Sequence, residues 1–206
     1  MKRTFYPLLT YGMLFLSITS STGVYAQQNN MNQTNITANA GDVAQSDNPL
    51  LAGWSGPYGG VPKLNEVRVE HFKPALEYAM DRNLNEIETI ASNPEPPGFA
   101  NTIEAMERSG KLLERVQTIY GIWSSTMNDD AFQKVEQEME PKLAGFADQI
   151  TQNSKLFARI EAVYNSKDKN KLTPEQQRLS WLYYTNFVRA GARLNTIDKA
   201  RLSQIN

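Results

Sequence analysis

The sequence predicts an all-α protein, and three features support this prediction. After residue 67, apolar residues recur every three or four positions, which is the period of one face of a helix. Prolines and short polar stretches interrupt this pattern, as they do where helices end and begin. No stretch alternates β-branched and polar residues over the length of a strand. We therefore expect five or more amphipathic helices joined by short loops.

The expected helices lie near residues 68–92, 101–127, 131–151, 155–165 and 174–193. The first must end before Pro94, because proline cannot continue a helix. Asn101 and Glu104 have the spacing of a capping box that begins the second helix. Gly110 is a weak point inside this second helix, since glycine is a poor helix former. The stretch Asn128-Asp129-Asp130 is expected to end the second helix and to cap the third.

The third and fifth helices and the end of the chain carry their own signals. Pro141 lies inside the third helix, so we expect a kink or break just before it. Thr173, Pro174 and Gln176 form the cap of the fifth helix. Further apolar residues up to Ile205 indicate another helix without a stop signal, and we expect the chain to be cut within it.

The N-terminus has the layout of a secretory signal peptide over residues 1–26. Lys2 and Arg3 precede an apolar stretch, and Val24-Tyr25-Ala26 resembles a cleavage site. The alternative is an uncleaved membrane anchor, but Thr10 and Gly12 interrupt a run that is already short of the roughly 20 residues a span needs. The expected location is therefore periplasmic or secreted, and the absence of cysteine excludes disulfides and lipid attachment through a cysteine.

The mature chain divides into a leader and a folded part. Residues 27–48 are rich in Asn and Gln and too polar to form a core, so we expect a disordered leader. Residues 49–206 form the expected helical domain, and its irregular start carries Trp54 and Tyr58, which are expected to pack on the helices. The formal net charge of -1 gives no electrostatic support to a nucleic-acid partner.

The sequence offers no set of catalytic, cofactor-binding or metal-binding residues. A catalytic zinc ion needs three protein ligands, and the chain has one histidine, no cysteine and no His-Glu-x-x-His motif. A Ser-His-Asp arrangement would have to use His71, which no Gly-x-Ser-x-Gly turn accompanies. We interpret His71 as a boundary residue that bonds the backbone or packs beside Pro74, in preference to a catalytic or ligand role.

Five other residues invite a functional interpretation. Glu136 and Glu140 lie one helical turn apart and could share a cation, although a solvated charged face is the favoured interpretation. Trp123 and Trp181 could stack on a ligand, but their helical spacing favours a place in the core. For Trp54, which lies outside a helix, both interpretations stay open.

Several short segments form an ordered pattern along the chain, namely Asn48-Pro49-Leu50-Leu51, Trp54, Gly56 to Pro62, Glu70 to Ala75, Asn93-Pro94, Asn101-Thr102-Ile103, Glu107 to Gly110, Pro141-Lys142-Leu143, Arg159-Ile160 and Arg189 to Ala192. Taken in this order, they resemble the start of the mature bacterial peptidyl-dipeptidases, which belong to the thimet oligopeptidase family. Lys63-Leu64, Gly98 and Ala100 depart from the family pattern in local loops. The resemblance covers residues 48–206.

The resemblance implies a function that this chain does not complete by itself. Members of the family are long, helix-rich zinc peptidases whose His-Glu-x-x-His motif lies far beyond residue 206. The chain is similar to their N-terminal helical lobe, which forms one wall of a channel that admits short peptides. The implied parent activity releases dipeptides from the C-termini of short peptides, with zinc as cofactor and a C-terminal catalytic lobe as the missing partner. This chain is then expected to be inactive alone.

Two other hypotheses stay open at this stage. The chain could be a free-standing, non-enzymatic module that binds peptides or partners, or an exported helical adaptor whose likeness to the family is accidental. As one wall of a channel, it should expose apolar residues that packed against the missing lobe. The residues expected there are Ile119, Ile122, Tyr184, Val188, Leu202 and Ile205. Alternatively, a second layer of helices within the chain covers them.

Overall fold

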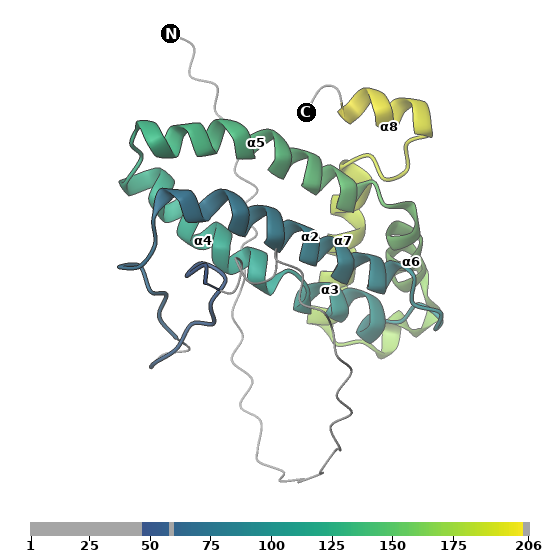
Figure 1. The fold of residues 1–206 in the computed structure, drawn as a ribbon. Coiled ribbons are helices and arrows are strands. Elements are labelled where there is room, and N and C mark those ends of the chain that lie inside the picture. The colour runs from purple at the N-terminus through teal and green to yellow at the C-terminus, as the bar shows by residue number, and fades with distance from the viewer. Residues whose placement is uncertain (1–46, 58–59, 204–206) are drawn as a thin grey trace, which may run out of the picture. The chain divides into compact units, whose positions relative to one another are not determined.

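The computed structural model describes residues 47–57 and 60–203 (Figure 1). The expected signal peptide, the expected leader up to residue 46, Tyr58 and Ile205 lie outside the described residues. Within the described ranges the only strand-like pairing is an isolated bridge between Ser55 and Val61. The prediction of an all-α fold is confirmed.

Helices follow one another along the described chain. They are η1 (Val69–His71), α2 (Phe72–Ala91), the π-helix η2 (Phe99–Glu104), α3 (Ala105–Arg108), α4 (Lys111–Thr126), α5 (Asp130–Thr151), α6 (Ser154–Asn165), η3 (Lys167–Lys171), α7 (Pro174–Arg189) and α8 (Thr196–Ser203). The expected first, third and fourth helices are confirmed as η1 with α2, α5 and α6. The expected second helix is not continuous.

The second helix is broken at Gly110. Its φ angle of 70° is left-handed, a conformation that favours glycine, and it separates α3 from α4. The Gly110 N–H donates a hydrogen bond to the Glu86 carboxylate on α2, with a donor–acceptor distance of 2.7 Å. A Cβ at this position would lie 3.1 Å from the Asn83 amide nitrogen. The break is therefore fixed by contacts with α2, which the local sequence does not show.

The expected role of Asn101 as the first cap of this region is also wrong. The helical stretch begins earlier, at Phe99, and the Asn101 side chain accepts a hydrogen bond from the Gly98 N–H at 2.8 Å. Asn101 thus reaches back to the residue that precedes the helix, as the third residue of a capping box does. The other two expected caps are confirmed: Asp129 accepts from the Phe132 N–H, and Thr173 caps α7.

Pro141 does not break α5, which is continuous from residue 130 to 151. Because Gln137 and Pro141 are both exposed, solvent can satisfy the Gln137 carbonyl that the proline leaves without a donor. In contrast, α7 ends at Arg189, four residues before the expected end. Gly191 adopts a φ angle of 86°, and the Ala192 N–H donates to the Phe187 carbonyl at 2.9 Å. This is the Schellman arrangement that terminates helices.

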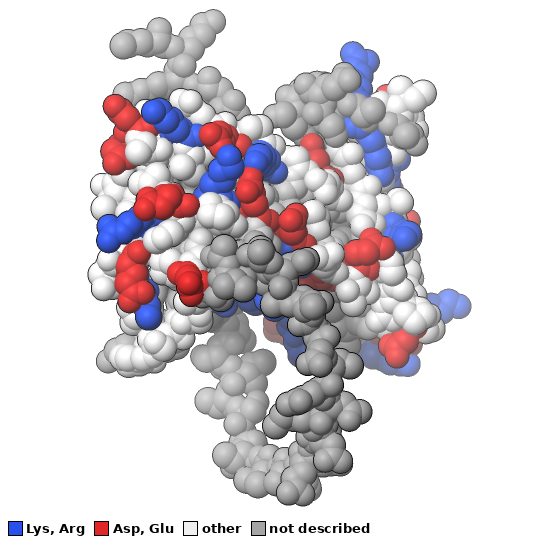
Figure 2. Space-filling model, in the orientation of Figure 1, with Lys and Arg blue, Asp and Glu red and all other residues white. Residues whose placement is uncertain are grey.

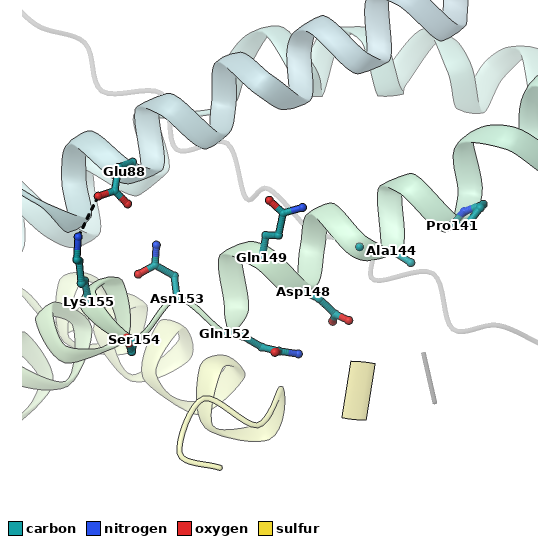
Figure 3. A pocket seen from close by; sticks show the side chains of 10 residues that line it. Glu88, Pro141, Ala144, Asp148, Gln149, Gln152, Asn153, Ser154 and Lys155 are labelled. Carbon is teal, nitrogen blue, oxygen red and sulfur yellow. Dashed lines mark hydrogen bonds and ion pairs between the residues drawn. The ribbon is translucent and has the colours of Figure 1, made fainter. Parts of the chain in front are cut away.

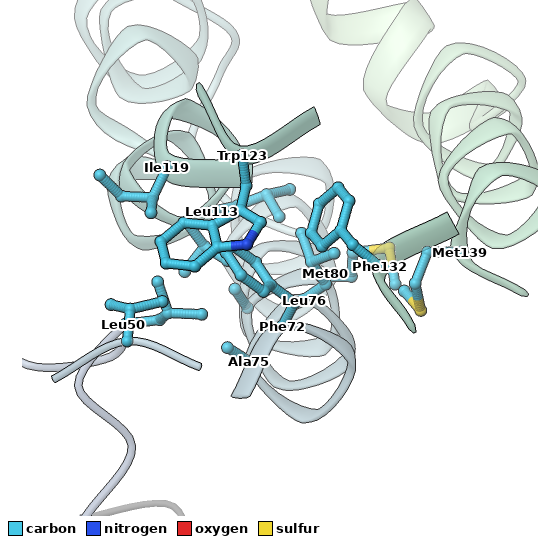
Figure 4. Packing of buried hydrophobic residues seen from close by; sticks show 13 residues of the cluster. Leu50, Phe72, Ala75, Leu76, Met80, Leu113, Ile119, Trp123, Phe132 and Met139 are labelled. Atoms are coloured by element: carbon cyan, nitrogen blue, oxygen red, sulfur yellow. The ribbon is translucent and has the colours of Figure 1, made fainter. Parts of the chain in front are cut away.

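The first hydrophobic cluster joins α2, α4, α5 and the segment before them (Figure 4). Its buried members are Leu50, Val67, Phe72, Ala75, Leu76, Ala79, Met80, Leu113, Val116, Ile119, Trp123, Phe132 and Met139. Phe72 lies at its centre, with its ring centroid 5.1 Å from that of Phe132 and 5.3 Å from that of Trp123. The core assignment of Trp123 is confirmed, and Trp54 packs half-buried against the same cluster.

A second hydrophobic cluster lies at the other end of α2. It joins α2 to η2, α3, α6 and α7, and its buried members are Ile87, Ile90, Ala91, Ile103, Met106, Leu156, Phe157, Ile160, Val163, Phe187 and Ala192. Since α2 contributes to both clusters, it is the element that connects them (Figure 1).

Ion pairs cross between the helices at the surface. Lys73 on α2 pairs with Glu138 on α5, which raises the pKa of the lysine and lowers the pKa of the carboxyl through their hydrogen bond and charges. A second pair, Glu77 with Lys142, joins the same two helices. Figure 2 shows basic and acidic side chains interspersed on this face. Such exposed pairs contribute little to stability, so the two clusters dominate the fold.

We expect alanine to have opposite effects at two glycines of this region. Gly121 lies inside α4, and no atom lies within 4 Å of an added Cβ, so Gly121→Ala should raise the free energy of unfolding by about 0.5–1 kcal/mol. Gly110→Ala should lower it by about 1–2 kcal/mol, because alanine must adopt a left-handed conformation. Urea denaturation of both variants measures this difference. Equal effects at the two positions would contradict the assigned break.

Candidate functional site

His71 makes the contacts of a helix-boundary residue. The Arg68 N–H donates a hydrogen bond to His71 Nδ1 at 3.0 Å, and the His71 carbonyl accepts from the Asn48 side chain at 2.9 Å. The interpretation that His71 bonds the backbone is confirmed. Asn48, which the sequence placed at the end of the polar leader, is buried and takes part in holding the start of α2.

Glu136 and Glu140 lie on the side of α5 that is near Tyr120 of α4. Burial, followed by the charges of these two carboxylates, raises the pKa of Tyr120 to about 12, so its hydroxyl stays protonated at neutral pH. Glu136 also accepts a hydrogen bond from Asn128 at 2.9 Å. Within residues 47–57 and 60–203, no group of three or more His, Cys, Asp or Glu side chains is placed to hold a metal ion.

The predicted burial of two apolar residues is wrong. One residue that was expected in the core is exposed, and one that was expected at the surface is buried. Trp181 is 43% exposed instead of buried, because Leu179, Tyr183 and Phe187 form the face of α7 that packs on the second cluster. Ile119, expected at the surface, is 2% exposed within the first cluster. Ile122 is exposed as expected. Three further residues expected in the exposed patch are only partly buried, namely Tyr184, Val188 and Leu202.

The described residues do form a hollow, which sequence reasoning missed. It is a cavity of about 740 Å³ along the C-terminal half of α5 and the start of α6, with one side chain from α2 (Figure 3). Its lining consists of Glu88, Pro141, Ala144, Gly145, Asp148, Gln149, Gln152, Asn153, Ser154 and Lys155. The small residues Ala144 and Gly145 leave this stretch of α5 without bulky side chains, which provides the space.

Specific contacts hold the end of the α5–α6 cavity that lies at the start of α6. Asn153 caps α6, since its side-chain oxygen accepts from the Leu156 N–H at 3.0 Å. Lys155 pairs with Glu88 of α2 at 3.3 Å, and Ser92 donates to the same carboxylate. The hydrogen bond from Ser92, then the contact with Lys155, lowers the pKa of Glu88, so this carboxylate stays ionised.

The lining of the α5–α6 cavity is rich in side chains that form hydrogen bonds. Gln149, Gln152 and Asn153 bring amide groups, which both donate and accept hydrogen bonds. Two features of the sequence point to this cavity in retrospect: a glycine inside a helix, and the polar stretch 151–155 that follows the apolar period of α5.

Comparison with known proteins finds relatives of which this chain spans only about a quarter of the length. It is 36% identical over 159 residues to the dipeptidyl carboxypeptidase of Escherichia coli (strain K12), covering 77% of this chain and 23% of that protein. The Salmonella typhimurium dipeptidyl carboxypeptidase is 35% identical over 161 residues, covering 78% and 24%. The probable cytosolic oligopeptidase A of Arabidopsis thaliana is 21% identical over 169 residues, covering 81% and 23%. No family model matches the chain. The chain belongs to the thimet oligopeptidase family.

The segments that resemble the thimet oligopeptidase family coincide with residues that shape the fold. Phe72 centres the first cluster, Gly110 breaks a helix, and Gly191 ends one. Asn101 and Arg159, from two separate segments of the resemblance, form a hydrogen bond of 3.0 Å. The likeness therefore rests on the architecture of this region.

None of the helices within residues 47–57 and 60–203 is apolar over a length that would cross a membrane.

Proposed function

We propose that this chain supplies the N-terminal helical lobe of an exported peptidyl-dipeptidase, an enzyme that releases dipeptides from the C-termini of short peptides. The observation that carries this proposal is the 36% identity to a dipeptidyl carboxypeptidase over most of the chain but only 23% of that enzyme's length. The remaining partner is then a C-terminal catalytic lobe. The proposal that the enzyme is exported rests on the signal-peptide pattern of residues 1–26.

Zinc belongs to the proposed complete enzyme and not to this lobe. A catalytic zinc site takes three protein ligands, usually with histidine among them. The described residues do not fit such an ion, since no three candidate ligand side chains come together among them. We therefore assign the zinc ligands and the His-Glu-x-x-His motif to the catalytic lobe, and expect the lobe described above to be inactive alone.

The role of the lobe in this proposal is to form one wall of the substrate channel. The α5–α6 cavity supports this role, because its volume of about 740 Å³ is within the range of about 300–1,000 Å³ typical of ligand sites. Its amide side chains can pair with the N–H and C=O groups of an extended peptide. Gln149 is exposed on this face, and Glu88 with Lys155 adds charges of both signs for peptide termini.

A chimeric enzyme tests the proposal. Residues 49–206 replace the matching segment of the Escherichia coli dipeptidyl carboxypeptidase, and dipeptide release from an N-terminally blocked peptide is measured. We expect the chimera to be active, whereas the isolated chain releases no dipeptide with or without added zinc. Zinc-dependent release by the isolated chain that survives repurification and is abolished by a chelator would overturn the assignment of the catalytic residues. A folded but inactive chimera would favour the free-standing binding module.

Matched variants within the chimera test the channel wall. Gly145 and Gly121 are both exposed helical glycines with no atom within 4 Å of an added Cβ, but only Gly145 lines the α5–α6 cavity. We expect Gly145→Phe to raise KM about tenfold with little change in kcat, and Gly121→Phe to leave both unchanged. Equal KM values for the two variants would remove the cavity from the substrate path.

A further inference from the structure

Trp181, which the sequence placed in the core, instead borders a second cavity. This cavity has a volume of about 200 Å³ and is lined by Tyr164, Lys169, Gln177, Ser180 and Trp181. Its residues come from α6, η3 and α7, and it shares none of them with the α5–α6 cavity. Exposed tryptophan and tyrosine side chains are enriched at binding surfaces.

Contacts within the chain hold the walls of this Trp181 cavity in place. The Tyr164 ring stacks on the Tyr184 ring with a centroid distance of 4.2 Å and an interplanar angle of 11°. The buried Ser180 hydroxyl donates to the backbone of its own helix, and the Gln177 side-chain nitrogen donates to the Leu172 carbonyl at 3.0 Å. The Gln177 side-chain oxygen is thereby oriented as an acceptor. Little ordering is needed before a ligand binds.

The rim of the Trp181 cavity is positively charged. Lys169 Nζ lies 5.6 Å from the Tyr164 ring centroid. Among the described residues, no carboxylate lies within ion-pair distance of Lys167 or Lys169, whereas Lys171 pairs with Asp168 at 2.8 Å. Lys169 therefore presents an unpaired charge beside the aromatic ring of Tyr164, in a chain whose net charge is -1. The complementary ligand is anionic and carries an apolar group.

The volume limits what this apolar group can be. Sites for drug-sized ligands have volumes of about 300–1,000 Å³, so about 200 Å³ suits a single side chain. We propose that the Trp181 cavity binds an acidic peptide segment: one aromatic side chain of the peptide packs between Tyr164 and Trp181, and a neighbouring carboxylate faces Lys169. The Gln177 oxygen accepts a hydrogen bond from the peptide backbone. This site goes beyond the proposed peptidase function and does not depend on it.

Fluorescence anisotropy with a fluorescein-labelled peptide, Asp-Glu-Phe-Glu-Asp, tests this proposal on the purified chain. We expect saturable binding that weakens between about 0.05 M and about 0.5 M salt, because the charges at the rim are solvent-exposed. A peptide with serine in place of phenylalanine, and one with lysine in place of every acidic residue, should bind at least about fivefold more weakly. Absence of saturable binding, or equal binding of either control peptide, would overturn the proposal.

Variants of the chain locate the binding site. Lys169→Glu should weaken binding about tenfold, and Trp181→Ala about fivefold. The matched controls are Leu182→Ala, at the neighbouring residue with the same 43% exposure, and Lys134→Glu on α5. Neither control should change the dissociation constant, and circular dichroism melts confirm that each variant is folded. Loss of binding in a control variant, or unchanged binding in Trp181→Ala, would place the peptide elsewhere.

Discussion

We expect Phe72→Ala to lower the free energy of unfolding by about 4 kcal/mol, a large part of the stability of a domain of this size. Phe72 is fully buried, and its ring contacts Tyr120, Trp123 and Phe132 in edge-on arrangements. Since these three rings come from α4 and α5, removal of the Phe72 ring leaves a cavity where three helices meet (Figure 4).

Urea denaturation followed by circular dichroism measures the effect. Phe72→Leu keeps much of the buried volume. Its loss in the free energy of unfolding should therefore be about 2 kcal/mol smaller than that of Phe72→Ala. Trp181→Ala removes a larger side chain but should cost at most about 1 kcal/mol, because Trp181 is 43% exposed. A larger cost for Trp181→Ala than for Phe72→Ala would contradict the assignment of the first cluster as the centre of the fold.

Helical periodicity predicted those elements that bury one face against one neighbour. In α5 the expected stripe faces the body of the protein, with Phe132 and Met139 fully buried. The N-cap at Asp129 was recognisable because the asparagine-aspartate stretch lies directly before the apolar period. Local signals were sufficient in these places, since the structure that they specify is itself local.

Contacts between distant residues explain where the sequence predictions were wrong. The break at Gly110 depends on Glu86, 24 residues earlier, whose carboxylate binds the Gly110 N–H. Ile119 is buried in the first cluster, which also contains Leu50 from the irregular segment before the helices (Figure 4). A segment without periodicity gives no sign in the sequence of the face that it will cover.

The two cavities could not be predicted for the same reason. The α5–α6 cavity brings Glu88 of α2 to the end of α5, and the Trp181 cavity joins residues of three elements. Composition did exclude a histidine- or cysteine-based zinc site, because ligand types can be counted without a structure. The sequence thus limits the chemistry of this chain more directly than it locates the binding surfaces.

Arg159 provides the second large expected effect, since its guanidinium holds the proline-rich loop between α2 and η2. Arg159 is 6% exposed, and its Nη1 atom donates to the Asn93 and Glu95 carbonyls at 2.8 and 3.0 Å. Its Nη2 atom donates to the Asn101 side chain at 3.0 Å, the same oxygen that accepts from the Gly98 N–H. One side chain from α6 therefore binds both ends of the loop.

We expect Arg159→Met to lower the free energy of unfolding by about 3 kcal/mol, because it leaves three partly buried acceptors without their charged donor. Arg159→Lys should restore less than half of this loss, since one ammonium group cannot reach acceptors on both sides as the planar guanidinium does. The control is Arg193→Met, whose 55% exposed side chain pairs with Glu161 and should cost at most about 1 kcal/mol. Hydrogen exchange at the Gly98 amide should quicken in Arg159→Met and stay unchanged in Arg193→Met. Full stability of Arg159→Lys would show that charge alone holds the loop and that the geometry of the three hydrogen bonds contributes nothing.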